Sequence, residues 1–249
     1  VLDMFKKNGN YDFLSLFQDV GGEEVERCID MSIATDIVVT ENKLTFNGTA
    51  PGIVYHAAFS KKSSWQYYDW GNQPAADSAG RAWYAKDYAN TSSWGSGNGI
   101  LGFNGSTATE TIGTTLHKYI NHASSGTQVY TYYFRKTFTL PAEAATSASV
   151  RINILYDDCY AIYINGTEVD RLYLAKNATY STFSDGGSAH KEEISRVVTI
   201  PAGLLRAGSN TIAVELHQNQ SASSDIYFDM GLDYATSGSG TCAIVVPPT

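Results

Sequence analysis

The chain has 249 residues, enough to bury a sizeable core as one large domain or as one domain with an extension. Its hydrophobic fraction of 43% excludes wholesale disorder, and its net charge of −8 with scattered Lys and Arg argues against nucleic acid as a partner. No run of about 18 apolar residues occurs, so we expect no membrane insertion. The low charged fraction (17%) with abundant Tyr and Gly is typical of extracellular β-sheet proteins, and predicts an extracellular or cell-surface location.

Residues 1–35 differ from the rest and are predicted to be a short helical extension or the remnant of a preceding domain. In residues 12–20 (DFLSLFQDV) the apolar side chains fall on one helical face, and the leading Asp is a suitable N-cap. Two glycines follow and end that helix, and residues 23–31 can form a second one.

Residues 36–234 carry the pattern of β-strands. Phe138 and Leu140 alternate with Thr137 and Thr139, as in a half-buried strand. Asn165-Gly166 is a tight hairpin turn, and no long helical pattern separates the strands. The fold class expected is therefore all-β, an antiparallel β-sandwich or jelly roll. The strands are predicted at 37–39, 43–46, 130–140, 149–156, 161–164, 168–173, 194–200, 210–218 and 225–233. The predicted core includes Phe134, Phe138, Ile152, Ile154, Ile162, Ile164, Ile212, Val214 and Phe228.

Gly-, Ser- and Asn-rich stretches between the strands are predicted to be loops, at 71–81, 90–107, 121–128 and 176–190. They are long for a compact domain, which often indicates a functional rim. Residues 235–249 are predicted to be a C-terminal linker or tail that leads to a neighbouring domain.

Five motifs in order resemble one family. They are SSWQYYDWG, AWYAKDYANTSSWGSGNGILGF, TYYFRKTFTLP, INILYDDCYAIYINGTEVDR and IPAGLLRAGSNTIAVELHQNQSASSDIYFDMGL. Together they resemble galactose-binding-like modules of secreted multidomain bacterial proteins, over roughly residues 63–234. The resemblance implies a carbohydrate-binding-module-like sandwich that works beside neighbouring domains. Two departures are Cys159, where relatives usually have Gly after Asp-Asp, and Trp70, where a small or polar residue is more usual.

Aromatic side chains are the first candidates for ligand contact, because a sugar ring presents an apolar face that stacks on flat rings. Trp65, Trp83 and Trp94 match motif positions that the resemblance assigns to the core and to loop anchors. Trp70 and Tyr84 flank the polar loop 71–81 and are better placed for exposed stacking. The predicted ligand-binding residues are Trp70 and Tyr84, with Tyr173 or Tyr180 as a second possibility.

A set of acidic residues is the second candidate for chemistry: Asp157, Asp158, Glu215 and Asp225. One interpretation is internal salt bridges, for example with Arg135 or Arg171, because a buried unpaired carboxylate is costly. The other is a structural calcium ion held by these carboxylates and backbone carbonyls, which the resemblance also implies. His217 shares a strand face with Glu215 and is interpreted as a hydrogen-bonded structural residue.

The three cysteines show no zinc-type spacing. Cys159 lies in an apolar strand and is predicted to be a buried thiol. Cys28 and Cys242 either form a disulfide in an oxidising compartment or remain free thiols, and the sequence leaves both open.

Catalytic signatures are absent from the sequence: it contains no GxSxG motif, no P-loop and no GxGxxG motif before a helix. We therefore expect a protein that is not an enzyme, a carbohydrate-binding accessory module of a larger secreted or cell-surface protein whose partner is a polysaccharide or glycan. A structural or adhesive protein–protein interaction module is the alternative. A catalytic fragment of a glycoside hydrolase is the third hypothesis, since Asp and Glu residues are available.

Overall fold

The computed structural model describes the backbone of residues 13–20, 23–30, 35–40, 43–47, 52–90, 92–105, 110–187, 189–238 and 243–245, and the side chains of 53–90, 92–105, 110–187 and 189–236. The chain divides into two compact units. One comprises Val1–His56 and Ala235–Thr249, and the other Ala57–Tyr234. The predicted domain boundary at residue 36 stays a prediction. No helix among the described residues has the length and apolar character needed to cross a membrane.

The first unit is built from short antiparallel ladders. Strand β2 (Glu23–Asp30) pairs with β1 (Phe13–Val20) and with the start of β5 (Gly52–Phe59). Strand β4 (Lys43–Asn47) pairs with β3 (Thr35–Thr40) and with β17 (Ala243–Val245), and this confirms the strands predicted at 37–39 and 43–46. Cys28 and Cys242, for which the sequence leaves both a disulfide and free thiols open, lie outside the residues whose side chains are described.

The short N-terminal helical segment predicted over 12–31 is not confirmed, because β1 and β2 occupy this range as a hairpin. Their register runs from Val20 opposite Glu23 to Phe13 opposite Asp30. A Gly-Gly dipeptide between two strand-forming stretches is also a sequence signal for a β-hairpin. Cross-strand pairing over eight residues therefore outweighs the helical spacing of the apolar side chains.

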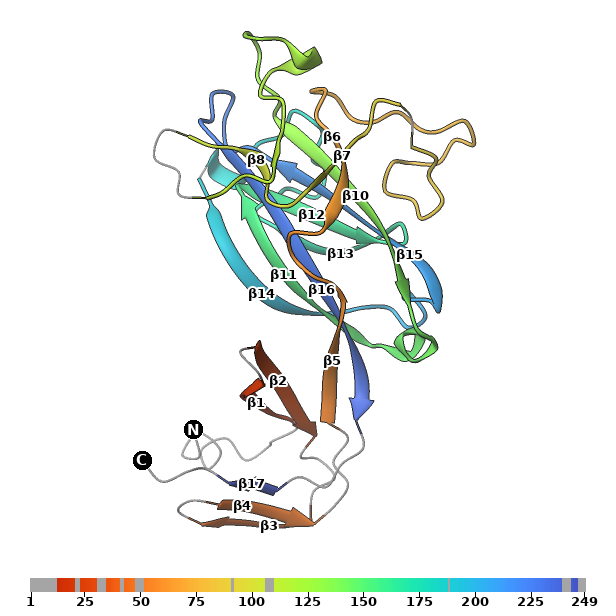
Figure 1. Ribbon diagram of the computed structural model, residues 1–249, viewed down its shortest axis with the longest axis vertical. Helices are drawn as coiled ribbons and strands as arrows, with labels where there is room; N and C mark the ends of the chain where they lie inside the picture. Colours follow the sequence, from red (N-terminus) through yellow and green to blue (C-terminus); the bar gives the residue numbers. More distant parts are fainter. Residues whose placement is uncertain are drawn as a thin grey trace. The chain divides into compact units, whose positions relative to one another are not determined.

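The second unit is an antiparallel β-sandwich, which confirms the predicted fold class. In one sheet β11 (Ser149–Asp157) lies between β16 (Ile226–Gly238) and β14 (Lys191–Thr199). Strand β8 (Leu101–Phe103) pairs with β16 and, in parallel, with β9 (Thr114–Thr115). The other sheet has the order β13 (Thr167–Leu172), β12 (Cys159–Ile164), β15 (Gly208–His217), β10 (Thr131–Leu140), β6 (Ser64–Tyr68) and β7 (Gly95–Asn98). Figure 1 shows the strands of the two sheets as two layers.

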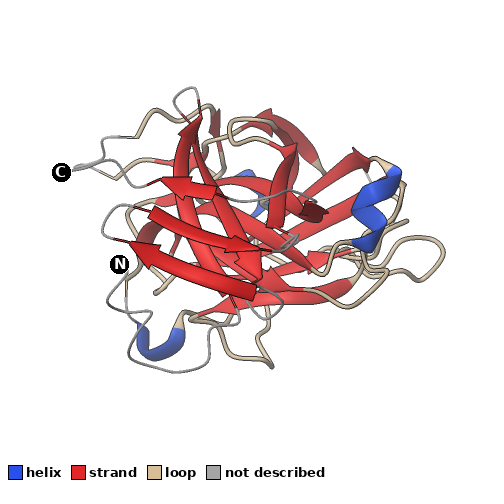
Figure 2. Cartoon of the chain, turned by 90° about the horizontal axis from the view of Figure 1, so that it is seen from below, coloured by secondary structure: helices blue, strands red, loops and turns tan. Residues whose placement is uncertain are grey.

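Short 3₁₀ turns are the helical elements of the described chain. They are η1 (Ile120–His122), η2 (Ala142–Thr146) and η3 (Asp185–Gly187). Figure 2 shows how small a share of the chain they take beside the strands.

The core lies between the two sheets and is dominated by β-branched and aromatic side chains. Every predicted core residue is buried: Phe138 is 6% exposed and the others are fully covered. The Phe228 ring stacks on Phe134, with centroids 4.0 Å apart, and meets Trp65 edge-on at 5.0 Å. Trp65 and Trp83 are buried, as the core assignment predicted, while Trp94 is half-buried.

The predicted Asn165-Gly166 turn is also confirmed. It joins β12 to β13, with Ile164 opposite Thr167, and both turn residues have positive φ, 50° and 90°. This is the backbone that a two-residue hairpin of matching twist requires, and Asn and Gly adopt it at low cost.

The stacked core generates the first prediction. Replacing Phe228 with Ala should lower the free energy of unfolding by about 3–5 kcal/mol, because it removes a fully buried ring and leaves a cavity. Val197→Ala on the exposed side of β14 is the control and should change it by less than about 0.5 kcal/mol. Chemical denaturation measures both, and equal effects would show that the assigned inner and outer faces are wrong.

Candidate functional site

An acidic pocket of about 350 Å³ lies at one end of the sandwich, where strands of both sheets begin or end. Its walls come from the end of β11, the start of β14 and the segment between β15 and β16. Three of the four residues predicted to bind metal meet here. The lining residues are Asp157, Asp158, Ala189, Lys191, Asn219, Gln220, Ser223, Ser224 and Asp225.

The carboxylates of this pocket differ in the hydrogen bonds that they accept. Asp158 Oδ1 accepts the His190 N–H at 2.8 Å, and its Oδ2 accepts the Asn219 N–H at 2.7 Å. Asp157 is 5% exposed, and its buried Oδ2 has no hydrogen-bond partner. Burial, followed by the nearby charges of Asp158 and Asp225, raises the pKa of Asp157 to about 8.

The one cation of the lining is already engaged. Lys191 Nζ lies 2.7 Å from Glu110 Oε1 and 4.0 Å from the centroid of the Tyr227 ring. The pocket therefore presents oxygen atoms with excess negative charge, a setting suited to hydroxyl donors or a hard cation.

An aromatic platform adjoins the pocket. The ring of Tyr173 stacks on His190 with centroids 3.7 Å apart and an interplanar angle of 6°. The residues on either side of His190, Ala189 and Lys191, both line the pocket. Tyr173 is 37% exposed and has a φ of 53°, a left-handed backbone that bulky residues rarely adopt. Stacking on one face leaves the rest of the ring available at the rim.

The fourth predicted metal residue, Glu215, lies elsewhere, on the outer face of the second sheet. Its Oε1 accepts the Tyr163 hydroxyl at 2.8 Å and lies 3.7 Å from Arg171. This matches the salt-bridge interpretation for that residue, although Arg135 instead donates to the carbonyls of Trp83 and Ala85.

Segment 71–94 covers this outer face. The Asp77 carboxylate orders this segment by accepting hydrogen bonds from the backbone N–H groups of Ala79, Arg81 and Ala89. These bonds, the one from Ala89 most of all, hold the pKa of Asp77 well below its usual range. Tyr84 is half-buried and stacks on Tyr163, with centroids 4.6 Å apart. One face of the Tyr84 ring is therefore covered by the protein.

The two remaining predicted aromatic residues have different settings. Trp70 is half-buried, stacks on His122 at 3.7 Å and donates its Nε1–H to the Ser93 carbonyl at 2.9 Å. Tyr180 is 45% exposed and does not line the acidic pocket. Sugar stacking at Trp70, Tyr84 and Tyr180 stays a prediction.

His217 and Cys159 are both fully buried beside this region. His217 Nδ1 lies 2.9 Å from Thr131 Oγ1 and 2.8 Å from the Thr182 carbonyl oxygen, so it fastens loop 176–190 to β10. Burial raises the pKa of the Cys159 thiol above its usual range. Both were interpreted correctly from the sequence.

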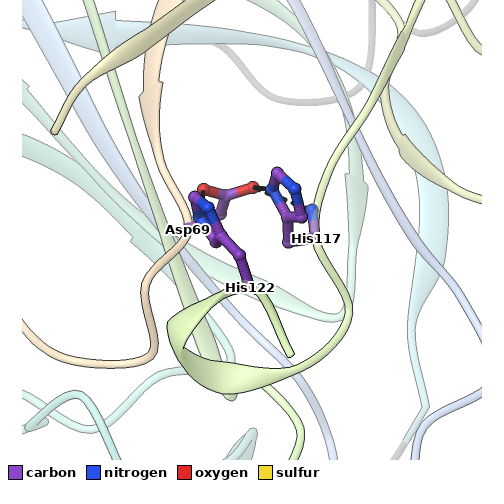
Figure 3. Close-up of side chains that lie close together, drawn as sticks. All are labelled: Asp69, His117 and His122. Carbon is purple, nitrogen blue, oxygen red and sulfur yellow. Dashed lines mark hydrogen bonds and ion pairs between the residues drawn. The ribbon is translucent and has the colours of Figure 1, made fainter. Parts of the chain in front are cut away.

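A further cluster consists of Asp69, His117 and His122, and no sequence motif predicts it. Each oxygen of the buried Asp69 carboxylate faces one imidazole: Oδ2 is 2.9 Å from His117 Nδ1, and Oδ1 is 2.9 Å from His122 Nε2 (Figure 3). One ligand atom from each residue lies within 4.8 Å of the others, and no other such group of His, Cys, Asp or Glu occurs in the described part of the chain. The two histidines are 48 and 53 positions from Asp69, so only the fold brings them together.

Comparisons with known proteins give structural similarity only. No family model and no curated protein matches the chain. Among solved structures, β-glucuronidase 2 of Bacteroides uniformis aligns with 17% identity and a TM-score of 0.43, over 73% of this chain and 18% of that one. A β-glucuronidase of Ruminococcus gnavus aligns with 9% identity and a TM-score of 0.38, over 80% and 30%. The chain spans less than a third of their length, and similarity at this level carries no inference about what it binds.

The pKa of Asp157 gives a prediction for calcium and pH. With a chelator present, so that no calcium is bound, an Asp carboxyl in the unfolded chain ionises near pH 4. The Asp157 carboxyl in the folded protein stays protonated up to about pH 8. The native state then binds more protons between these values, so stability should fall as pH rises through this window. Asp157→Asn should remove most of this pH-dependent loss of unfolding free energy, on the order of a few kcal/mol. Calcium should raise the melting midpoint of the wild-type protein at pH 8, because the ion favours the ionised Asp157 carboxylate.

Melting with calcium and with chelator across this pH range measures both effects. The exposed Asp87, which pairs with Lys86, supplies the control Asp87→Asn, and this variant should behave as wild type. A midpoint that chelator leaves unchanged, with no metal in elemental analysis, would reject calcium here.

Proposed function

We propose that this chain is a non-catalytic carbohydrate-binding accessory module of a larger secreted or cell-surface protein, of the galactose-binding-like type. The observation that carries the proposal is the acidic pocket at the end of the sandwich with the Tyr173 ring fixed beside it. Its partners are a polysaccharide or glycan and the neighbouring domains of the full-length protein.

The pocket offers what a sugar ring needs. Carboxylates accept hydrogen bonds from hydroxyl groups, and the Asn219 and Gln220 amides donate as well as accept. The Ser223 and Ser224 hydroxyls donate to the carbonyl and the carboxylate of Asp225 and so offer a ligand their acceptor lone pairs. Tyr173 supplies a flat apolar surface for the C–H face of the sugar. These groups are held on a rigid sandwich, as binding loops generally are.

The charge of the pocket favours one class of glycan. Three carboxyl groups and one lysine line the pocket, and that lysine is paired with Glu110. A neutral or amino-bearing sugar suits this environment, whereas a uronic acid or sulfated glycan would be repelled unless calcium bridged it. Calcium would need further oxygen ligands, because these carboxylates do not converge as closely as the Asp69 cluster.

The protein-interaction alternative has less support. Among the described residues the exposed large hydrophobic side chains are Tyr173, Tyr180 and Val197, and a broad apolar patch is the usual mark of a protein interface. The glycosidase hypothesis has less support too, because both oxygens of Asp158 are held by backbone N–H groups and Asp157 is deeply buried.

Binding should depend on Tyr173. Tyr173→Ala should weaken retention on a binding polysaccharide about tenfold, since aromatic stacking contributes roughly 1 kcal/mol beyond area burial. Affinity electrophoresis, with and without calcium, measures it once a glycan array has identified the polysaccharide. A single site of this kind is weak, so the module would act through avidity with its neighbours.

Tyr180→Ala is the matched control. Both tyrosines are exposed, lie between β13 and β14 and are outside the pocket lining, but Tyr173 is the one that stacks on His190, whose two neighbours line the pocket. The Tyr180→Ala variant should keep wild-type retention. Equal loss in both variants would place binding on the loop as a whole, and retention that survives Tyr173→Ala with an unchanged melting midpoint would refute the pocket. A double Trp70→Ala, Tyr84→Ala variant that abolishes retention without unfolding would move the site to those rings.

A further inference from the structure

The Asp69 carboxylate is an unusual buried charge. It is 1% exposed, and its ion-pair partners in the described part of the chain are His117 and His122, with neither Lys nor Arg among them. The His117 backbone N–H also donates to Oδ2, at 2.8 Å. A buried carboxylate without a permanent cation is costly, so this position favours a positively charged partner.

The two imidazoles are arranged as ligands around this carboxylate. Their rings are parallel, with centroids 3.6 Å apart and an interplanar angle of 10°, and both direct a nitrogen to Asp69. Neutral imidazole nitrogens are the form that binds transition metals.

The surrounding chain holds the cluster in place. The His122 ring stacks on Trp70 with centroids 3.7 Å apart and on His117 with centroids 3.6 Å apart. Two rings cannot stack on the same face of a third ring at these distances, so His122 lies between Trp70 and His117. The Asn121 N–H donates to the Trp70 carbonyl, and the Tyr132 hydroxyl donates to the His117 carbonyl. His122 has a φ of 57°, a left-handed backbone that the turn maintains.

We propose that Asp69, His117 and His122 bind one Zn²⁺ ion, with water at the fourth position. Two neutral nitrogens and one carboxylate oxygen are a donor set that zinc takes, whereas calcium prefers oxygen alone. Tetrahedral zinc with bonds of about 2.0–2.1 Å places its ligand atoms roughly 3.3 Å apart. One ligand atom from each of the three residues lies within 4.8 Å of the others, so zinc would draw the side chains together by at most about 1.5 Å.

The side that remains open faces solvent. The His117 and His122 side chains are 46% and 26% exposed, while Asp69 is buried beneath them. The ion would join the residue after β6 to the segment before η1, through His117, and to η1 itself, through His122, and it would fix the orientation of Trp70. It would also leave one coordination position for a ligand oxygen.

Zinc titration of the chelator-treated full chain tests the proposal. We expect one Zn²⁺ per chain by calorimetry, unaffected by excess Ca²⁺, and a higher melting midpoint in zinc. His117→Gln and His122→Gln should each weaken binding at least about 100-fold, more than loss of a group that merely supports a ligand. His56→Gln, at a histidine that bonds Thr236 instead, is the control and should bind as wild type.

The wild-type chain supplies a second measurement that does not depend on any variant folding. Of its five histidines, zinc should shift the ring ¹⁵N resonances of His117 and His122 and leave His56, His190 and His217 unchanged. Absence of stoichiometric binding, displacement by Ca²⁺, or shifts confined to other histidines would overturn the proposal. None of these readouts involves a glycan, so they are independent of the carbohydrate-binding proposal.

Discussion

The central constraint in the sandwich is the long antiparallel ladder of β10 and β15, which runs in unbroken register from Thr131 opposite His217 to Leu140 opposite Gly208. Because side chains alternate across a strand, this ladder fixes two surfaces at once. Phe134 and Val214 face the core between the sheets, while Tyr133 and Ala213 face outward and are covered by segment 71–94. A slip of one residue would exchange the two surfaces.

Loops around this ladder are held largely by carboxylates that accept backbone N–H groups. Asp77 fixes segment 71–94, Asp158 fixes the start of β14 and the segment after β15, and Asp229 receives the N–H groups of Lys62 and Met230. Hydrogen bonds to charged acceptors are stronger than neutral ones, so a few acidic residues can order long polar loops. The loops predicted to be a functional rim are thus in part an ordered cover of the sheet.

The sequence pattern predicted the strands in which apolar and polar residues alternate. It did not predict strands whose residues have no such alternation and are extended because they hydrogen-bond to a neighbouring strand. Strand β7 has the sequence GSGN and lies within the predicted loop 90–107. Its glycines are there because space is short: a Cβ on Gly95 would meet the Tyr67 ring, and one on Gly97 would meet Thr114. Glycine composition therefore indicated a loop where close packing requires glycine.

The candidate sites divide in the same way. Asp157 and Asp158 are adjacent in sequence and close to a strand end, so the acidic pocket could be anticipated, and Asp225 joins it because β16 begins beside the end of β11. Glu215 could not be separated from them by sequence, since its outward orientation follows from the register of β15 against β12. The Asp69 cluster draws on three segments with no local motif, and only the path of the chain after β9 brings its histidines to one carboxylate.

The two acidic centres differ in chemistry because their neighbours differ. In the pocket the donors are oxygen atoms, and Asp157 keeps an unsatisfied buried oxygen among like charges, so hydroxyl groups or a hard cation are the partners that relieve it. At Asp69 each carboxylate oxygen already meets an imidazole nitrogen, and the mixed donor set selects a softer ion. Burial makes both carboxylates costly, and the identity of the nearest side chains decides what each can bind.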